Sequence, residues 1–448
     1  MKYLSITRIN PFTLFIPLLF LSSGIVAQKY TDSPYSRYGI GLLNHTSFNG
    51  NFGMSGTGYA WRPYQYKPLI YDSLSRSSAN LNDRGTNYIN PKNPASYSNI
   101  SLTTFEAGLL SRNVEYTNNE QSRVGSNTQL SHMSLAFPLG EKWGMGFGIK
   151  PYSSIGYDYE TNGSVNGNDL TYVFEGNGGL NQMFIGTAFE FEKNFSVGIA
   201  LNYLFGSLVD SRRVVYGPNT TNFFNTLDQR ITNVDGFNFD LGFQYFKNIS
   251  NNYRLIGAFT ASPIDQLNAK QTEIVRNYTG RVGFENFKDT ASVRIGEKFD
   301  VEIYPSYGVG FAIEKKLNWI FNLDYTIYLR NNIDLDQGIS FTNNHLISAG
   351  FEKYNDISAF GNYFKQVGFR TGVKYNTALL TVNGEDIQEF GISFGLALPL
   401  RKTFSTLNFG IEVGRRGKDE LGLTQEDYLN FQVGVTINDK WFIQRKYD

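Results

Sequence analysis

The chain of 448 residues contains no cysteine. We therefore expect no disulfide, no thiolate metal site, no thiol catalysis and no cysteine-linked lipid anchor. Charged residues are scarce at 18%, whereas soluble domains carry about a quarter. Lysine plus arginine balances aspartate plus glutamate at 40 each. Proteins that bind nucleic acid usually show a basic surplus, so no nucleic-acid partner is expected.

Long apolar runs are also missing. Beyond Gln28 no run approaches the 18 or more residues that a membrane-spanning helix needs. Yet aromatic residues make up 16% of the chain, and glycine occurs 45 times. The mean hydropathy is only -0.30. A membrane β-barrel resolves this combination, because its strands turn half of their residues to lipid and half to a wet lumen.

The N-terminus has the pattern of a secretory signal peptide over residues 1–27. Lys2 and Arg8 supply a positive region, residues 12–21 are apolar apart from Thr13 and Pro17, and Ala27 precedes Gln28 at the expected cleavage position. The apolar run is too short for a membrane anchor. An exported chain that is rich in strand pattern fits the outer membrane of a Gram-negative bacterium.

Residues 28–100 differ in character from the rest. They are rich in Tyr, Asn, Ser, Gly and Pro, and they lack sustained alternation. Their aromatic content is too high for a disordered linker. Irregular backbone at membrane depth is tolerated only when protein or a wet cavity surrounds it. We therefore interpret residues 28–100 as a plug and residues 101–448 as the barrel.

From residue 101 onward the pattern becomes one of long strands with period two. In residues 319–327, for example, Phe321, Leu323 and Tyr325 alternate with Asn322 and Asp324. We predict an all-β fold, a fourteen-stranded antiparallel transmembrane barrel. Its expected strands are residues 101–117, 126–138, 141–160, 168–190, 193–216, 230–247, 251–277, 290–313, 316–330, 337–353, 365–378, 387–399, 404–415 and 428–443.

Residues that could carry catalysis are few. His45, His132 and His345 are the three histidines, and they are far apart in sequence without a recognisable partner motif. A histidine that is satisfied in the lumen or at the interface is the more frequent situation, so no enzyme and no catalytic residue is predicted. No cluster has metal-ligand spacing. We predict no cofactor and no metal.

Other polar positions have a structural and a functional interpretation. Asp334 and Asp336 are typical of solvated loop carboxylates, although calcium also takes such oxygens. Asp240, Asp324 and Glu412 are expected in the lumen, where they either bind a polar ligand or, more often, hydrogen-bond the plug. The glycines at 144, 146 and 148 lie on one strand face and would make room for the plug.

Three local motifs resemble the FadL-type outer-membrane transporters of hydrocarbons and long-chain fatty acids. Residues 53–60 are similar to the glycine-rich start of the family's hatch. Asn93, Pro94 and Ala95 match its Asn-Pro-Ala motif before the first strand, and residues 150–159 are similar to its Pro-aromatic-Gly third strand. Residues 33–41 and 439–447 look like the Bacteroidota branch of the family.

The resemblance implies a kinked third strand that opens the wall sideways. Pro151 cannot donate to the strand ladder, so a kink or bulge is expected there on physical grounds as well. The gate would combine Asn93, Pro94 and Ala95 with Pro151, Tyr152 and Gly156, and Asn93 could hydrogen-bond backbone exposed at the break.

The plug aromatics Trp61, Tyr64 and Tyr66 either line an apolar path or pack the plug into the barrel. The long Tyr-rich insertion at residues 64–88 departs from a simple fatty-acid tunnel.

Two functions follow from these features. The first is passive uptake of a hydrophobic small molecule, with lateral exit into outer-membrane lipid. The alternative is a non-transporting structural or accessory subunit of an outer-membrane protein assembly or secretion complex, with other outer-membrane proteins as partners. Fold alone does not decide between them.

Overall fold

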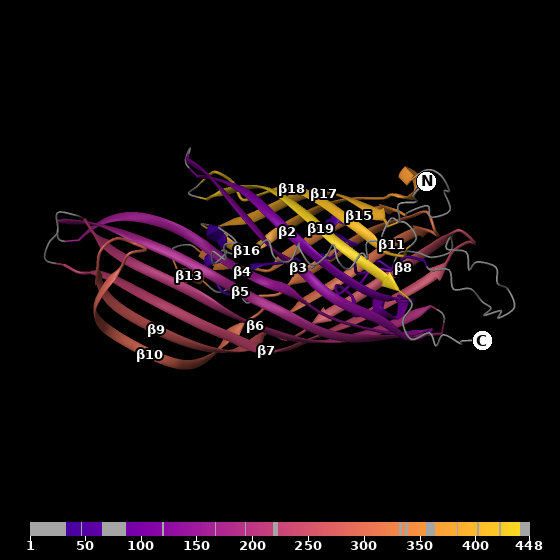
Figure 1. The fold of residues 1–448 in the computed structure, drawn as a ribbon, viewed down its shortest axis with the longest axis horizontal. Helices are drawn as coiled ribbons and strands as arrows, with labels where there is room; N and C mark the ends of the chain where they lie inside the picture. The colour runs from indigo at the N-terminus through magenta and orange to yellow at the C-terminus, as the bar shows by residue number, and fades with distance from the viewer. Residues whose placement is uncertain are drawn as a thin grey trace, which may run out of the picture.

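The computed structural model describes residues 33–45, 47–64, 87–118, 121–165, 167–192, 194–217, 223–330, 334–336, 339–354, 363–382, 384–400, 403–420 and 423–439. Over these residues the chain forms a closed antiparallel barrel of 14 strands around an N-terminal plug, which confirms the expected fold class (Figure 1). The last strand, Gln425–Asp439 (β19), pairs with the first strand of the wall, Thr103–Asn118 (β2), and this pairing closes the ring.

The remaining wall strands complete the antiparallel ring, in which most, but not all, pair with the next strand in sequence. They are β3 (Gln121–Gly140), β4 (Trp143–Val165), β5 (Asn168–Phe191), β6 (Phe195–Tyr216), β7 (Asn225–Asn248), β8 (Tyr253–Ser262), β9 (Gln266–Thr279), β10 (Asn286–Glu302), β11 (Ser306–Lys315), β12 (Trp319–Tyr328), β13 (Asp334–Asp336), β14 (Ile339–Phe341), β15 (Asn344–Lys353), β16 (Gly368–Val382), β17 (Glu385–Pro399) and β18 (Thr406–Arg416).

Three of the expected strands are each interrupted into two, and the strand expected at residues 316–330 is followed by a further short strand beyond its predicted end. β8 continues as β9, β10 as β11 and β14 as β15, while β13 follows β12. Pro263 and Pro305 lie at the first two interruptions, as expected for a residue that cannot donate to a ladder. Asp334 and Asp336 are the ends of β13.

The alternation of side chains sets the register of the wall. On β12 the side chains of Phe321, Leu323 and Tyr325 are exposed on the outside, whereas Asn322 and Asp324 are buried inside. A slip by one residue would turn every apolar side chain into the lumen, so this pattern fixes the pairing.

Strand length shows where the membrane lies. β8, β11 and β12 have 10 residues each, which matches the 9–11 residues that a tilted strand needs to cross the hydrocarbon. β4 to β7 have 22 to 24 residues and extend well beyond it (Figure 1). Short turns join the strands at the opposite end, for example between β3 and β4. Barrels of this class keep short turns on the periplasmic side.

The described part of the predicted plug, residues 33–45, 47–64 and 87–100, lies inside the ring. A short 3-10 helix at Phe52–Met54 (η3) contacts β15 to β18, and a second at Pro94–Asn99 (η5) contacts β4 to β7. The side-chain nitrogen of Asn49 donates to the carbonyls of Ala107 on β2 (3.3 Å) and Val435 on β19 (2.9 Å). One plug residue therefore bridges the first and last strands of the wall.

Inward glycines admit the plug backbone. A side chain at Gly144 would collide with the carbonyl of Tyr97, and one at Gly146 would touch the Tyr97 ring. These two positions make room for the plug as expected. Gly148 instead lies against Met133 and Ser134 of β3, so its space serves the wall. The exact boundary between plug and barrel near residue 100 stays a prediction. The predicted signal peptide at residues 1–27 and Tyr66 lie outside the described residues.

We expect Gly242→Val to destabilise the barrel, because its Cβ would collide with Asn93 and lie 2.9 Å from both the Ala95 nitrogen and Pro94. Overpacking of this kind costs about 1–3 kcal/mol. The matched control is Gly257→Val, where a Cβ meets nothing within 4 Å. Urea unfolding in detergent micelles measures both. Equal stability of the two variants would show that the plug does not press on β7.

Candidate functional site

The predicted gate begins with Asn93, which precedes η5 and caps it. Its side-chain oxygen accepts from the Ala95 nitrogen at 3.0 Å. Its side-chain nitrogen donates to the carbonyls of Tyr59 in the plug (2.8 Å) and Phe243 on β7 (3.2 Å). Asn93 thus ties two plug segments to the wall, but it does so at β7 and not at the third wall strand, β4, where the bond was expected.

The wall does break beside Pro151. The pairing of β3 with β4 runs from Gly140 and Trp143 to Met133 and Ile149, and it ends there. Beyond Ile149, β4 pairs only with β5 and the plug in the described part of the chain, and a bulge between Pro151 and Ser153 interrupts the β5 ladder. We call this opening between β3 and β4 the seam. It begins where the sequence predicts a kink.

The plug itself covers the open edge of β4. A two-residue strand, Leu42–Leu43 (β1), pairs with Ser154 and Ser153, and the Asn44 nitrogen donates to the Tyr152 carbonyl at 2.9 Å. Further along β4, the Ser36 hydroxyl donates to the Gly156 carbonyl and accepts from the Gly156 nitrogen, both at 2.9 Å. The first plug segment therefore supplies the hydrogen bonds that β3 does not.

The two halves of the predicted gate lie apart. Pro151, Tyr152 and Gly156 border the seam and contact residues 36–44. Pro94 and Ala95 instead lie against Gly198 of β6, on the side of the plug that faces β5 to β7. The sequence motifs identified both the turn at residues 93–95 and the break in the wall at Pro151, but the structure does not bring the two together in one site.

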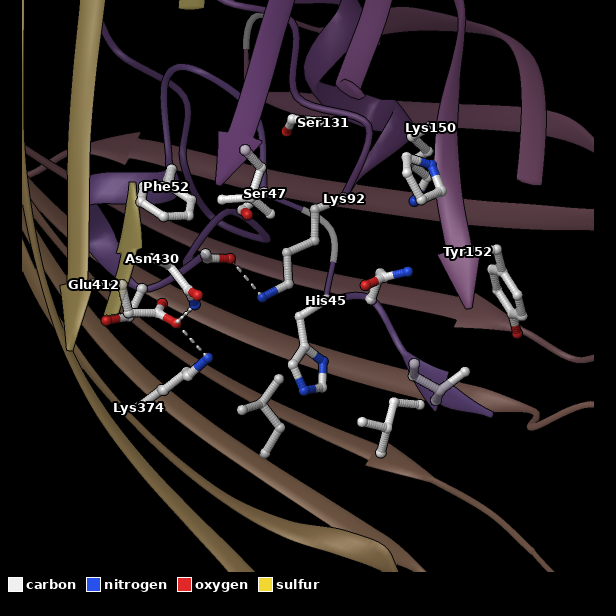
Figure 2. Close-up of a pocket in the computed structure, with 18 of the residues that line it drawn as sticks. His45, Ser47, Phe52, Lys92, Ser131, Lys150, Tyr152, Lys374, Glu412 and Asn430 are labelled. Carbon is white, nitrogen blue, oxygen red and sulfur yellow. Dashed lines mark hydrogen bonds and ion pairs between the residues drawn. The ribbon is translucent and has the colours of Figure 1, made fainter. Parts of the chain in front are cut away.

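A cavity of about 210 Å³ lies between the plug and the wall. Figure 2 shows Lys374 and Asn430 both directed at Glu412, with His45, Lys150 and Tyr152 on the same cavity. Apolar side chains contribute, notably Leu42, Leu43 and Phe52. The charged groups that line the cavity are Lys92, Arg112, Lys150, Asp240, Lys374, Glu389, Glu412, Arg416 and Glu426.

Most of these charges neutralise one another. Lys374 contacts Glu389 and Glu412 at 3.0 Å each, and Arg416 contacts Glu389 at 2.9 Å and Glu426 at 3.1 Å. We call these five residues the charge cluster. Of these five residues, only Glu412 was predicted from the sequence to face the lumen. The other four lie at inward-facing positions of strands in which polar and apolar residues alternate. This alternation is the sequence signal that could have identified them.

Buried carboxylates of the wall hold the plug. Asp324 accepts from the backbone nitrogens of Gly58 (2.7 Å) and Tyr59 (3.1 Å) and from the ammonium of Lys92 (3.0 Å). Its side chain is 1% exposed. This is the plug-bonding role that we expected to be the more frequent one for a lumen carboxylate.

Of the three plug aromatics singled out from the sequence, Trp61 and Tyr64 lie among the described residues, and both bind wall carboxylates. The Trp61 indole donates to Glu352 at 3.0 Å, and the Tyr64 nitrogen donates to Glu314 at 2.6 Å. Trp61 is 2% exposed, and neither residue lines the main cavity. They pack the plug into the barrel, while Tyr66 lies outside the described residues.

The three histidines lie in separate environments. His132 stacks on Phe48 at 3.8 Å and lies 3.6 Å from Glu106. His45 contacts Asn376 at 3.3 Å, and His345 contacts Tyr325 at 2.8 Å. Within the described ranges no group of three or more His, Cys, Asp or Glu residues could hold a metal ion.

Comparison with protein families gives one match, to the BamG family, over residues 79–448. No curated protein matches the sequence. Among the described residues, no helix is both long and apolar enough to cross a membrane.

Three solved structures share the fold. A FadL homologue of Pseudomonas aeruginosa is 11% identical, with 90% of this chain and 100% of that chain covered and a TM-score of 0.55. The toluene transporter TodX of Pseudomonas putida is 15% identical, with coverages of 86% and 100% and a TM-score of 0.51. The monoaromatic hydrocarbon channel CymD is 13% identical, with coverages of 89% and 99% and a TM-score of 0.50. These neighbours are channels and not enzymes, and they confirm the expected FadL-type fold.

Asp324→Asn should lower the free energy of unfolding by about 3 kcal/mol, because it leaves the Lys92 ammonium without its buried counter-charge. The control is Asp427→Asn, which breaks an exposed pair with Arg415 and should cost at most about 1 kcal/mol. Urea unfolding of both variants makes the comparison. A loss at Asp324 no larger than at Asp427 would contradict its role as a plug anchor.

Proposed function

The chain belongs to the BamG family, and we propose that it acts as a non-transporting structural subunit of an outer-membrane protein assembly or secretion complex. The observation that carries this proposal is the set of buried wall carboxylates that hold the plug. A subunit of this kind contributes surfaces to its partners, and it needs no route through its own lumen.

The attachment of the plug supports a closed barrel. Asp324, Glu352 and Glu314 bind plug groups on β12, β15 and β11. Arg62 of the plug reaches Glu190 of β5 at 2.8 Å. The first three strands are adjacent in the wall, whereas β5 lies in another part of the ring, so the plug is held from two sides. Displacing the plug would break the ion pairs Lys92–Asp324 and Arg62–Glu190, and breaking a buried pair costs about 3–5 kcal/mol.

The chemistry of the cavity supports the same function. A hydrocarbon path needs walls that lack strong polar groups, because an apolar ligand cannot replace their hydrogen bonds. Here the charge cluster and Lys150 face the space. A cavity of this lining favours water over a fatty acid or an aromatic hydrocarbon.

Under this proposal the partners are other outer-membrane proteins, with outer-membrane lipid around the wall. No cofactor, metal or nucleic acid takes part. The mature chain would begin at Gln28, after export and cleavage behind Ala27.

A tagged chain isolated from its native outer membrane in mild detergent should bring other proteins with it at fixed ratios. Mass spectrometry identifies these proteins, and size-exclusion chromatography tests whether they migrate as one particle. A second tagged barrel from the same membrane is the control for nonspecific capture. A lone barrel that carries extractable hydrocarbon or lipid ligand would refute the proposal.

A second function, passive uptake of a hydrophobic small molecule, is favoured by one observation, the seam. It would serve as a lateral exit into lipid beside Pro151, Tyr152 and Gly156, and β1 would act as its cover. In this scheme Asn93, Pro94 and Ala95 would brace the plug at β7 while the cover moved. Trp61, Tyr64 and Tyr66 would border the ligand path.

A disulfide between Leu43→Cys and Ser153→Cys would lock β1 onto β4, since these positions are direct cross-strand partners and the chain has no other cysteine. Paired strand positions lie within disulfide reach. If the chain is a structural subunit, complex formation and uptake of hydrophobic compounds by cells should be unchanged by the lock. Uptake that falls on oxidation and returns on reduction would instead establish the seam as an exit.

A further inference from the structure

The hairpin of β9 and β10 continues the wall beyond the membrane. The ten-residue strands β8 and β11 end at Ser262 and begin at Ser306, while β9 and β10 carry the sheet further along β7. In Figure 1 this hairpin curves along one side of the long end of the barrel. It therefore lies on the extracellular side, in water.

One edge of β10 has no partner strand. Every residue pairing of β10 in the described part of the chain is with β9, from Asn286 to Glu302. The next strand around the ring at this height, β13, pairs with β14. At the base of the opening, Glu302 lies 3.7 Å from Arg330 and the Leu329 nitrogen donates to the Pro305 carbonyl at 2.8 Å.

Bulges divide β10 and leave one regular run. Register shifts lie between Phe287 and Asp289, between Thr290 and Ser292, and between Arg294 and Glu297. Residues 297–302 pair with residues 266–271 without interruption. An approaching strand needs a regular ladder, so only this six-residue run offers one. We call residues 297–302 the docking edge.

The docking edge has an apolar and an acidic character. Val301 packs against the buried cluster that contains Leu267, and Phe299 pairs with Ala269 on the same face. Phe299 nevertheless remains 42% exposed. Glu297, Asp300 and Glu302 outnumber the single Lys298, which leaves the edge with a negative balance.

We propose that the docking edge binds an extended segment of a partner polypeptide as an added β-strand. Only a polypeptide presents the alternating donors and acceptors that a strand edge requires. The segment would place an apolar side chain against Phe299 and basic side chains toward the acidic residues. This proposal rests on the proposed function, since it assigns a place where the complex is joined.

Hydrogen exchange measured by mass spectrometry tests the added strand. Peptides that cover residues 297–302 are compared between the purified chain and the chain in its native outer membranes. The amides that point away from β9 should exchange rapidly in the purified chain and should become protected in membranes. Peptides of β6, which is paired on both sides, provide the control and should exchange alike in both samples.

A pair of variants tests the edge chemistry. Phe299→Glu removes the apolar contact and adds a charge that repels the edge's own acids, so recovery of the partner with the tagged chain should fall about tenfold. Phe284→Glu makes the same change at a residue that precedes β10 and is 79% exposed, and it should leave recovery unchanged. The heat-induced shift of the folded barrel on gels verifies that both variants fold.

The outcomes separate this inference from the function on which it rests. If partners co-purify at fixed ratios while the amides of residues 297–302 stay unprotected, the docking edge is overturned and the proposed function stands. The same holds if partners co-purify and the Phe299→Glu variant recovers the partner in full. A chain that purifies alone and shows equal exchange in both samples would overturn both. Protection that comes from a second copy of this chain, seen as a homodimer, would also overturn the proposed partner.

Discussion

A strand edge cannot face lipid without a partner, because hydrocarbon offers its amides and carbonyls nothing to bond. This constraint organises the molecule. The wall leaves β4 without β3 beyond Ile149, and β1 takes the vacant side with Leu42 and Leu43. The unpartnered edge of β10, by contrast, lies beyond the ten-residue strands that mark the hydrocarbon. There, water can hydrogen-bond the backbone amides and carbonyls of this edge until a partner strand binds.

The interior follows a similar rule. Carboxylates that point inward must find cations or donors inside the barrel, and the plug supplies them. Asp324 receives two plug amides and Lys92, while Glu352 receives Trp61 and Arg370. In the charge cluster the wall strands satisfy one another, and the plug adds the hydroxyl of Ser33, which donates to Glu426. The interior is thus polar and internally paired, which fits a supporting element better than a path for hydrocarbons.

Much of the wall was predictable from the sequence, because alternation is a local signal. The period-two runs located the wall strands except β13, and Pro151 marked the place where pairing fails. The glycines at 144 and 146 correctly indicated contact with the plug. Each of these features depends on the identity of a few neighbouring residues.

The remaining features depend on contacts between residues far apart in the chain. Nothing local shows that Leu42 and Leu43 complete β4, or that Asn93 bonds β7 and not the third strand. The same holds for Lys374, Glu389 and Arg416, which look like solvated charges until the ring brings them together. The interruptions at Pro263 and Pro305, which set the height of the β9 and β10 hairpin, were also passed over because the flanking alternation is continuous.

The position of Asn49 has a consequence for the order of assembly. Its amide reaches carbonyls on both the first and the last wall strand. The plug lies near the N-terminus, yet this docking site is complete only when the C-terminal strand β19 has paired with β2. The Asn49 contacts therefore couple plug docking to ring closure. A barrel that closed without its plug would leave Asp324 without Lys92 and Glu190 without Arg62.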